Sequence, residues 1–338
     1  MPTSPDGRLH VLLLYETRPE IIPAHVPADA FMEFDTPETV DAIVSSLRSL
    51  GHVVTSLHSQ ENAAERLFGL RREIDVVFNC SAGFGTRFRE LMPAALCEHL
   101  NLPYTGSDPM AQALSANKHA TKLIAQRAGV RTPRWWLSDG PPSDDFAADA
   151  SVVIKPNFEG TSIGIRGPIK VCDYAEVHRA MQEVVALYGQ PAIVEEFVAG
   201  YEVTVPILGN PPVALPPLTL TPDGTPRASE LIFDSVRKSD ATTGISWICA
   251  PFGAAILDTL RSAARVVHEA LGCRDLSRSD FRVTETGEVF FLELNATPQI
   301  GPGNSFMKSG ASDTFAGLLQ RILDVALSRY PHCRVGTR

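Results

Sequence analysis

The hydrophobic positions of this chain follow two different periods, and the order of these periods along the sequence predicts the fold. Residues 9–15 form a continuous apolar run, as in a buried strand of a parallel sheet. Apolar residues at helical spacing fill 36–51, where a threonine followed by a proline predicts the start of a helix. Strand-like runs return at 53–57 and 74–80, with helical sequence between them. This β-α-β order predicts an open parallel sheet, so the predicted fold class is α/β.

The hydrophobic pattern at 276–295 predicts two antiparallel strands, joined by a turn whose glycine allows a positive φ. An even turn sets Phe281 opposite Leu292 on an apolar face. Helical patterns precede and follow this hairpin, at 256–271 and 314–328. The second face of the hairpin is polar and carries Arg278, Asp280, Glu293 and Asn295.

This polar face has the residue types of a cation site. Directly opposed residues lie roughly 5 Å apart at Cβ, so Asp280 and Glu293 can share a cation, with the Asn295 carbonyl one step along. Oxygen ligands that leave room for water and phosphate suit Mg²⁺ better than zinc. Arg278 beside them would hold an anion. The alternative is an ordinary hairpin with a solvated charged face, but an unpaired carboxylate would be costly within so apolar a strand.

A glycine-rich loop follows the predicted strand 151–155, which ends in a lysine. The loop, 159–164, reads Glu-Gly-Thr-Ser-Ile-Gly. Glycines let backbone N–H groups approach phosphate oxygens, hydroxyls add donors, and Lys155 supplies charge. No Gly-Lys-Ser/Thr sequence closes the loop, so it is not a Walker A loop, and a plain hairpin turn is the alternative reading.

Two further features suit a nucleotide. Lys118 and Lys122 lie at i and i+4 in a helix predicted at 115–128, where like charges are unfavourable unless an anion lies between them. Two strands follow at 193–205, and their carboxylates lie in an apolar setting, as a slot for a purine and its ribose requires. These carboxylates belong to Glu195, Glu196 and Glu202.

Ligands of an open α/β sheet sit outside the carboxyl ends of its strands. The first strand ends in Tyr-Glu-Thr-Arg at 15–18 and the third leads into a glycine-containing loop at 79–85, so Glu16 and this loop are candidates for substrate contact. Glycines required only for turn geometry are the alternative. The first strand is not followed by Gly-x-Gly-x-x-Gly, so a dinucleotide fingerprint is absent. The largely polar segment 233–251 is expected to fold over a pocket.

Composition narrows the class of partner. The 338 residues are 44% hydrophobic, which suits a globular protein with a sizeable core. A net charge of -9 argues against nucleic acid, whose binding needs clustered lysine and arginine. No apolar run approaches the roughly 20 residues of a membrane span, and the start lacks the features of a signal peptide. We therefore expect a cytoplasmic protein without a membrane partner, whose scattered cysteines are reduced and whose ligands are small molecules.

Taken in order, these segments resemble the ATP-grasp ligases, and more closely the D-alanine–D-alanine ligase group. The resemblance covers 75–312. It lies in Pro-Tyr-Thr-Gly-Ser at 103–107, Glu-Gly-Thr-Ser-Ile-Gly at 159–164, Glu-Glu-Phe-Val-x-Gly at 195–200 and Phe-Leu-Glu-Leu-Asn at 291–295. It implies an α/β fold with an α+β C-terminal half, divided into a Rossmann-like domain at 8–108, a central ATP-grasp lid domain at 109–197 and a C-terminal ATP-grasp domain at 198–338.

The resemblance also implies roles for individual residues. ATP would be bound by Lys118, Lys155, Thr161, Ser162, Ile163, Glu195, Glu196, Phe197, Val198 and Glu202. Two Mg²⁺ ions, for which Mn²⁺ is a possible substitute, would be bound by Asp280, Glu293 and Asn295. Catalytic roles fall to Arg278, which stabilises an oxyanion, to Lys238 in a closing loop and to Ser162. Substrate contacts fall to Arg278 and to Ser305, the latter for the acceptor carboxylate, and the place of Glu16 after the first strand predicts a third contact.

The implied chemistry is ATP-dependent ligation. A carboxylate takes the γ-phosphoryl group of ATP, and an amine then attacks the acyl phosphate to form an amide or peptide bond. Members of the group commonly form homodimers. Several of its substrate residues are replaced here: Tyr-Glu-Thr-Arg at 15–18 stands for Gly-Gly-x-Ser-x-Glu, Ala82 for a histidine, Ser239 for a tyrosine and Asn117 for an aspartate.

These replacements lead us to expect substrates other than two D-alanines, in a specialised biosynthetic or resistance pathway. A cell-wall D-alanine–D-alanine ligase with a divergent pocket, an intramolecular cyclo-ligase and a non-catalytic ATP-binding protein are the alternatives.

Overall fold

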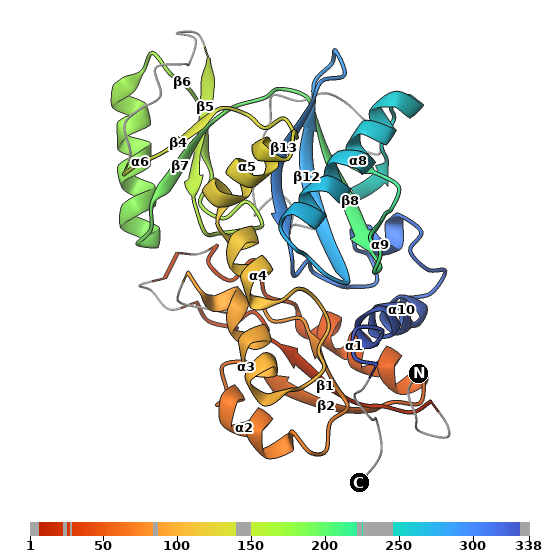
Figure 1. Cartoon of the computed structure of the whole chain (residues 1–338). Helices are drawn as coiled ribbons and strands as arrows, with labels where there is room; N and C mark the ends of the chain where they lie inside the picture. Colours follow the sequence, from red (N-terminus) through yellow and green to blue (C-terminus); the bar gives the residue numbers. More distant parts are fainter. Residues whose placement is uncertain are drawn as a thin grey trace.

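The computed structural model describes residues 7–22, 26–27, 29–83, 87–139, 150–221, 225 and 246–331. Within these residues the strands form three sheets, which lie in different parts of the molecule (Figure 1). The first sheet is parallel, and the two that follow in the chain are antiparallel. This confirms the predicted α/β class with an α+β C-terminal half.

The parallel sheet has the order β2-β1-β3 and contains the apolar runs predicted as strands. Its elements are β1 (His10–Tyr15), α1 (Pro37–Ser49), β2 (Val53–His58), α2 (Ala63–Leu70), β3 (Val76–Asn79), η1 (Arg89–Leu91) and α3 (Met92–Leu100). The first helix begins as expected, because the Thr36 side chain accepts a hydrogen bond from the Thr39 N–H and Pro37 is the first helical residue. Helices α2 and α3 pack on one face of the sheet, and α1 packs on the other together with the C-terminal helix α10 (Phe315–Leu327).

The helix predicted at 115–128 is instead two helices, α4 (Pro109–Ala116) and α5 (Lys118–Arg127). Asn117 separates them because its backbone lies outside the helical region, and its side chain caps the first turn of α5. Ser115, the first residue of the predicted helix, therefore lies in the last turn of α4 and is not an N-cap. Asparagine is among the strongest N-cap residues, so the break between the two helices follows from the residue at this position.

The central antiparallel sheet carries the glycine-rich loop between two of its strands. Its order is β4-β7-β5-β6, and helix α6 covers one face through Val177, Ala180 and Val184 (Figure 1). The elements are β4 (Trp135–Leu137), β5 (Ser151–Pro156), β6 (Arg166–Lys170), α6 (Tyr174–Tyr188) and β7 (Ala192–Glu196). The loop therefore leaves the end of β5 and returns into β6.

The third sheet has the order β11-β10-β8-β12-β13, with β9 beside β8, and packs on α8. Its elements are β8 (Tyr201–Leu208), β9 (Val213–Ala214), β10 (Leu218–Thr221), β11 (Ser246–Cys249), α8 (Ala254–Ala270), β12 (Leu276–Val283) and β13 (Val289–Asn295), and α9 (Ser305–Lys308) follows. The two strands predicted at 193–205 belong to different sheets, because the chain crosses from β7 to β8 between them.

The β12-β13 hairpin has the polar face predicted from the sequence, but its turn length and its strand pairing beyond Asp280 differ from the prediction. Asp280 is opposite Glu293 and Arg278 is opposite Asn295, as expected. The pairing of Phe281 with Leu292 is wrong, since a bulge after Asp280 sets Phe281 opposite Phe291. The turn is odd, with the Thr284 N–H donating to the Glu288 carbonyl, and the bulge compensates for the extra residue.

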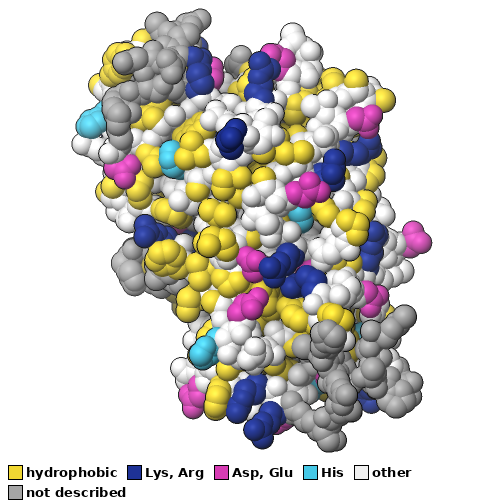
Figure 2. Space-filling view, viewed as in Figure 1, with side chains coloured by type: hydrophobic (Ala, Val, Ile, Leu, Met, Phe, Trp, Pro, Cys, Tyr) yellow, Lys and Arg dark blue, Asp and Glu magenta, His cyan; other side chains and the backbone are white. Residues whose placement is uncertain are grey.

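Charges of both signs are interspersed on the molecular face in Figure 2, so the described residues there form no extended patch of one sign. None of the helices within the described ranges combines the length and hydrophobicity that crossing a bilayer requires.

A fully buried carboxylate joins the first and third sheets. Asp275, in the turn before β12, accepts hydrogen bonds from the Gly106 N–H at 2.7 Å and from the Asn210 side chain at 2.7 Å. Arg329, just after α10, donates to both of its oxygens at 2.7 and 2.8 Å. Three parts of the chain that are remote in sequence therefore depend on one carboxylate.

Replacing Asp275 by asparagine is expected to lower the free energy of unfolding by about 3 kcal/mol, because Arg329 then keeps its charge in a largely buried site without a counter-charge. Asparagine has nearly the same shape and tolerates the positive φ of this position. Urea unfolding measures the change, with the exposed Asp324→Asn on α10 as the control. A loss below about 1 kcal/mol would contradict the assigned role.

Candidate active site

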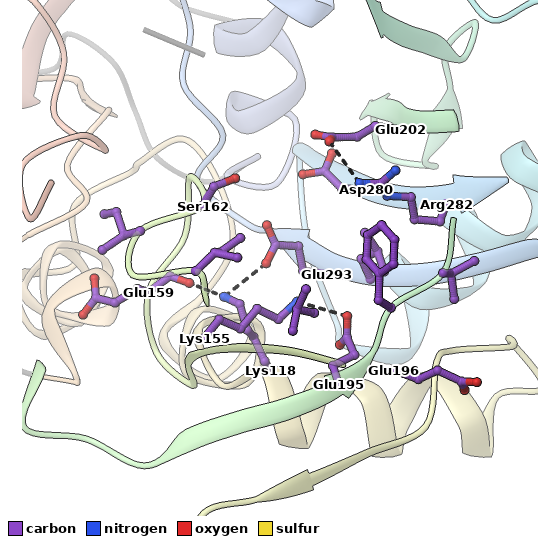
Figure 3. A pocket seen from close by; sticks show the side chains of 16 residues that line it. Lys118, Lys155, Glu159, Ser162, Glu195, Glu196, Glu202, Asp280, Arg282 and Glu293 are labelled. Carbon is purple, nitrogen blue, oxygen red and sulfur yellow. Dashed lines mark hydrogen bonds and ion pairs between the residues drawn. The ribbon is translucent and has the colours of Figure 1, made fainter. Parts of the chain in front are cut away.

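Two adjoining cavities lie between the central sheet and the third sheet. The first is lined from α5, β5, the glycine-rich loop, β7, β8, β12 and β13 (Figure 3). The second also reaches residues of the N-terminal part and of α9. Four residues line both cavities: Ser162, Glu202, Asp280 and Glu293. The two spaces therefore meet at the hairpin face.

The lysines of the first cavity are held by carboxylates. Lys118, the first residue of α5, lies 3.1 Å from Glu293 and donates to the Glu159 carbonyl (Figure 3). Lys155 and Lys122 lie 3.1 and 2.5 Å from the two oxygens of Glu195. These buried carboxylates explain how Lys118 and Lys122 can occupy neighbouring turns of one helix.

Charges within this network shift its protonation equilibria. Burial lowers the pKa of Lys122 to about 8, against the opposing effect of Glu195. Burial would raise the pKa of Glu195, but Lys122 and Lys155 lower it below its usual range. Lys155 is thus held in position by an ionised glutamate that has almost no exposure of its own. That arrangement fixes the lysine side chain toward the cavity.

The glycine-rich loop has an unusual backbone. Thr161 and Ser162 have φ angles of 47° and 61°, in the left-handed region that residues other than glycine rarely adopt. The φ of Gly164 is 69°, and its N–H donates to the Asp29 carboxylate at 2.9 Å. Consecutive residues in this region cluster at ligand-binding sites, where the surrounding structure holds them.

Apolar side chains line one part of the first cavity, which we call the apolar slot. It is lined by Val153, Ile163, Ile165, Phe197, Val198 and Leu292. Glu202 and Arg282 lie at one end of the slot, 3.9 Å apart (Figure 3). Glu196 lies at the rim, where it makes two hydrogen bonds with Arg134. A flat apolar space with a carboxylate at one end matches the needs of a purine nucleoside.

The hairpin face brings the predicted polar quartet together. Arg278 donates to both oxygens of Asp280, at 3.0 and 2.9 Å, and Thr204 donates to one of them at 2.6 Å. The Asn295 amide reaches Asp280 at 3.4 Å. Burial alone would raise the pKa of Glu293, but Lys118, Lys155 and Arg278 lower it to about 2. The carboxylate of Glu293 is therefore ionised at all working pH values.

These side chains fit a divalent cation whose remaining ligands are phosphate oxygens and water. Asp280, Glu293 and Asn295 supply only oxygen and amide ligands, which magnesium prefers. Among the described residues no three His, Cys, Asp or Glu side chains are grouped closely enough to bind a metal ion by themselves. Phosphate oxygens and water are the usual partners of a magnesium ion held by so few side chains.

Comparisons with known proteins identify the family. Residues 147–323 match the family model for the D-ala D-ala ligase C-terminus. The D-alanine–D-alanine ligase of Oleidesulfovibrio alaskensis is 30% identical over 292 residues, covering 85% of this chain and 90% of that protein. The chain belongs to the D-alanine–D-alanine ligase family. It is therefore an ATP-grasp ligase.

Two further comparisons show the breadth of this ligase family. The crystal structure of the Bacillus anthracis D-alanine–D-alanine ligase complexed with ATP is 18% identical, with a TM-score of 0.71, covering 95% of this chain and 98% of that one. This likeness shows the ATP-grasp fold. A Sinorhizobium fredii protein described as uncharacterized is 28% identical, covering 86% of this chain and 88% of that protein.

Most of the predicted residues of the ligase site lie around the two cavities. The first cavity gathers Lys118, Lys155, Ser162, Ile163, Glu195, Glu196, Phe197, Val198, Glu202, Asp280 and Glu293, and the second adds Thr161, Arg278 and Ser305. Asn295 lines a third cavity, beside Arg278. The predicted Lys238 and most of the closing segment 233–251 lie outside the described residues.

Glu16 is the exception. It is 2% exposed, accepts hydrogen bonds from Ser59, Ser81 and the Ala82 N–H, and is absent from the lining of these cavities. Arg18, two residues later in the same strand end, lines the second cavity instead. Glu16 thus lies behind the lining of these cavities, close enough to Asp35 to raise its pKa, and its contact with substrate stays a prediction.

The sequence did not single out two arginines that line this ligase site. Arg18 lies in the Tyr-Glu-Thr-Arg segment after the first strand but was not predicted as a site residue. A charged residue just beyond a buried strand often contacts a ligand, and Arg18 lines the second cavity. Arg282 lies two residues after Asp280, so strand alternation puts it on the same face of the hairpin as Arg278 and Asp280. It lines the first cavity, and this alternation is the signal that could have identified it.

Proposed function

We propose that this protein is an ATP-dependent carboxylate–amine ligase. It forms an amide or peptide bond between small amino-acid-like substrates through an acyl phosphate, and it releases ADP and phosphate. One observation carries the proposal: the lysine-lined first cavity and the arginine-lined second cavity meet at Asp280 and Glu293. A phosphoryl donor and a carboxylate acceptor would face each other there.

The first cavity supports the assignment of ATP. Phe197 and Val198 would contact the adenine, and Glu202 would accept from the ribose hydroxyls. Lys118 and Lys155 would contact the phosphates under the glycine-rich loop, whose Ser162 lines the same cavity. Fixed cations at these positions stabilise the charge that spreads over a transferred phosphoryl group.

Two magnesium ions, held by Asp280, Glu293 and Asn295, would offset phosphate charge when bound. Side chains of the protein would bind the two substrates and stabilise the oxyanion. Arg278 would hold the carboxyl oxygen that becomes an oxyanion when the amine attacks, because its guanidinium is fixed by two hydrogen bonds to Asp280. Ser305, at the start of α9, would bind the acceptor carboxylate.

The substrate side supports substrates other than two D-alanines, within a specialised biosynthetic pathway. The strand end after β1 supplies Arg18 to the second cavity, while Glu16 is turned into the protein. A cell-wall D-alanine–D-alanine ligase with a divergent pocket is the second candidate, favoured by the curated relatives of that name. We further propose a cytoplasmic homodimer with domains at 8–108, 109–197 and 198–338.

Phosphate release with ATP, Mg²⁺ and pools of amino acids tests the function. Release that requires two substrates supports intermolecular ligation, and release with a single substrate indicates cyclisation or hydrolysis. Preference for D-alanine alone would favour the cell-wall candidate. Absence of release with every pool would contradict ligation and favour a nucleotide-binding role.

Replacing Ser305 by alanine is expected to raise the acceptor KM about tenfold, with a smaller change in kcat. Its hydroxyl lines the second cavity beside Asn304, which caps α9 and should keep the helix start intact. Steady-state kinetics with varied acceptor measures the change. Ser309→Ala, in the same stretch but bonded to the Pro216 carbonyl, is the control. An unchanged acceptor KM would count against this role.

A further inference from the structure

A third cavity adjoins the second on its N-terminal side. It is lined by Glu33, Asp35, Cys80, Glu90, Arg278 and Asn295 among others. It shares Arg278, Thr161 and Gln299 with the second cavity but does not include Ser305. We call it the acidic recess. The two cavities therefore meet at Arg278, and the proposed acceptor residue lines only the second.

One carboxylate of the acidic recess lacks a partner in the part of the chain that the structure describes. Asp35 is 7% exposed, and no hydrogen bond or ion pair from these residues reaches its side chain. Arg18 is near enough to affect it electrostatically, but its guanidinium donates to the carbonyls of Phe34 and Met32. Its oxygens are left to face the cavity, where a ligand that donates hydrogen bonds would offset the cost of its burial.

The other carboxylates around the recess share a single cation. Arg89 lies 2.9 Å from Glu33, 3.0 Å from Glu159 and 3.7 Å from Glu90, all largely buried. The second nearby arginine, Arg278, is already paired with Asp280. Burial and neighbouring carboxylates raise the pKa of Asp35 to about 7 and that of Glu90 to about 8. The protein itself therefore does not fully stabilise the ionised forms of these two carboxyls, and a cation bound in the recess would stabilise them.

We propose that the acidic recess binds a positively charged side chain of the donor substrate, with Asp35 as its principal partner. The inference rests on the proposed ligase function and narrows the donor to a basic amino acid, such as a diamino acid. The donor carboxylate would lie at Arg278, where the recess meets the second cavity. Its side-chain ammonium would extend away from the nucleotide toward Asp35.

Charge favours this occupant. The recess carboxylates are not grouped as a metal-binding cluster among the described residues. An ammonium group can donate three hydrogen bonds, which suits a recess lined by several separated carboxylate oxygens.

Hydroxylamine trapping tests the donor without knowledge of the acceptor. With ATP and Mg²⁺, hydroxylamine attacks the acyl phosphate, releases phosphate and leaves a hydroxamate of the donor. Ornithine against norleucine, and diaminobutyrate against norvaline, differ only by an ammonium in place of a methyl group, and both enantiomers are used. We expect the basic donor to be favoured on the order of 100-fold in kcat/KM.

Replacing Asp35 by asparagine is expected to reduce this preference at least about tenfold. Asp258→Asn, an exposed charge on α8, is the control for net charge and should preserve the preference. Equal use of basic and neutral donors, or an unchanged preference in the Asp35 variant, would overturn the inference and leave the ligase function standing.

A hydroxamate from no donor would count against the ligase function itself. Calorimetry then tests the recess separately, by titrating ornithine and norleucine into ADP-loaded protein. Tighter binding of ornithine, lost in Asp35→Asn, supports the inference. Equal binding, or binding of neither, contradicts it.

Discussion

Replacing Glu293 by glutamine is expected to lower kcat on the order of a thousandfold, because the variant loses an ionised ligand at the point where the two cavities meet. Glutamine keeps the shape of the side chain but cannot neutralise Lys118, 3.1 Å away. Steady-state phosphate release measures the loss. Urea unfolding should detect a decrease in stability of about 1–3 kcal/mol, so the protein remains folded.

Glu288→Gln is the matched control for this change. Glu288 lies beside the turn of the same hairpin, where it is half-exposed and pairs with Arg131 at 2.7 Å. Its replacement should leave turnover within about twofold, because an exposed ion pair contributes little. Turnover by the Glu293 variant at a wild-type rate would remove Glu293 from the proposed metal site.

Replacing Arg278 by alanine is expected to lower kcat by on the order of 10²–10³, with the KM for ATP changed less than about threefold. Arg278 lines the second cavity and the acidic recess but not the first cavity. The loss should therefore fall on the acyl-transfer chemistry and not on nucleotide binding.

The control for the Arg278 variant is Arg265→Ala, an exposed arginine of α8 that pairs with Glu269. Titration with ADP separates binding from chemistry in both variants. A large rise in the ATP KM with an unchanged kcat would contradict the role of Arg278 as the group that stabilises the oxyanion.

The hairpin shows how far the sequence predicts this site. Strand alternation predicted that Arg278, Asp280, Glu293 and Asn295 share a face, and the structure confirms it. The inner pairing was wrong because an odd turn and a bulge cancel each other, and both require long-range contacts to be recognised. The outer register was right because a polar quartet on the buried face would have been unfavourable.

Other features depend on partners that are remote in sequence. The apolar run at 9–15 predicted a strand, but nothing local reveals that Glu16 turns inward to Ser59 and Ser81. The two lysines of α5 predicted that an anion lies beside them. Lys118 pairs with Glu293 and Lys122 pairs with Glu195, and both pairs form only when β7 and β13 pack near that helix. The acidic recess likewise forms only when 33–35 meets η1 and the hairpin.

Isotope transfer tests the acyl phosphate most directly. A donor amino acid with both carboxyl oxygens labelled with ¹⁸O is incubated with ATP, Mg²⁺ and an acceptor, and the released phosphate is analysed by mass spectrometry. The proposed chemistry predicts one ¹⁸O atom in each phosphate, because the donor oxygen that attacks phosphorus leaves with it. Unlabelled phosphate from a reaction that forms the amide product would contradict the account.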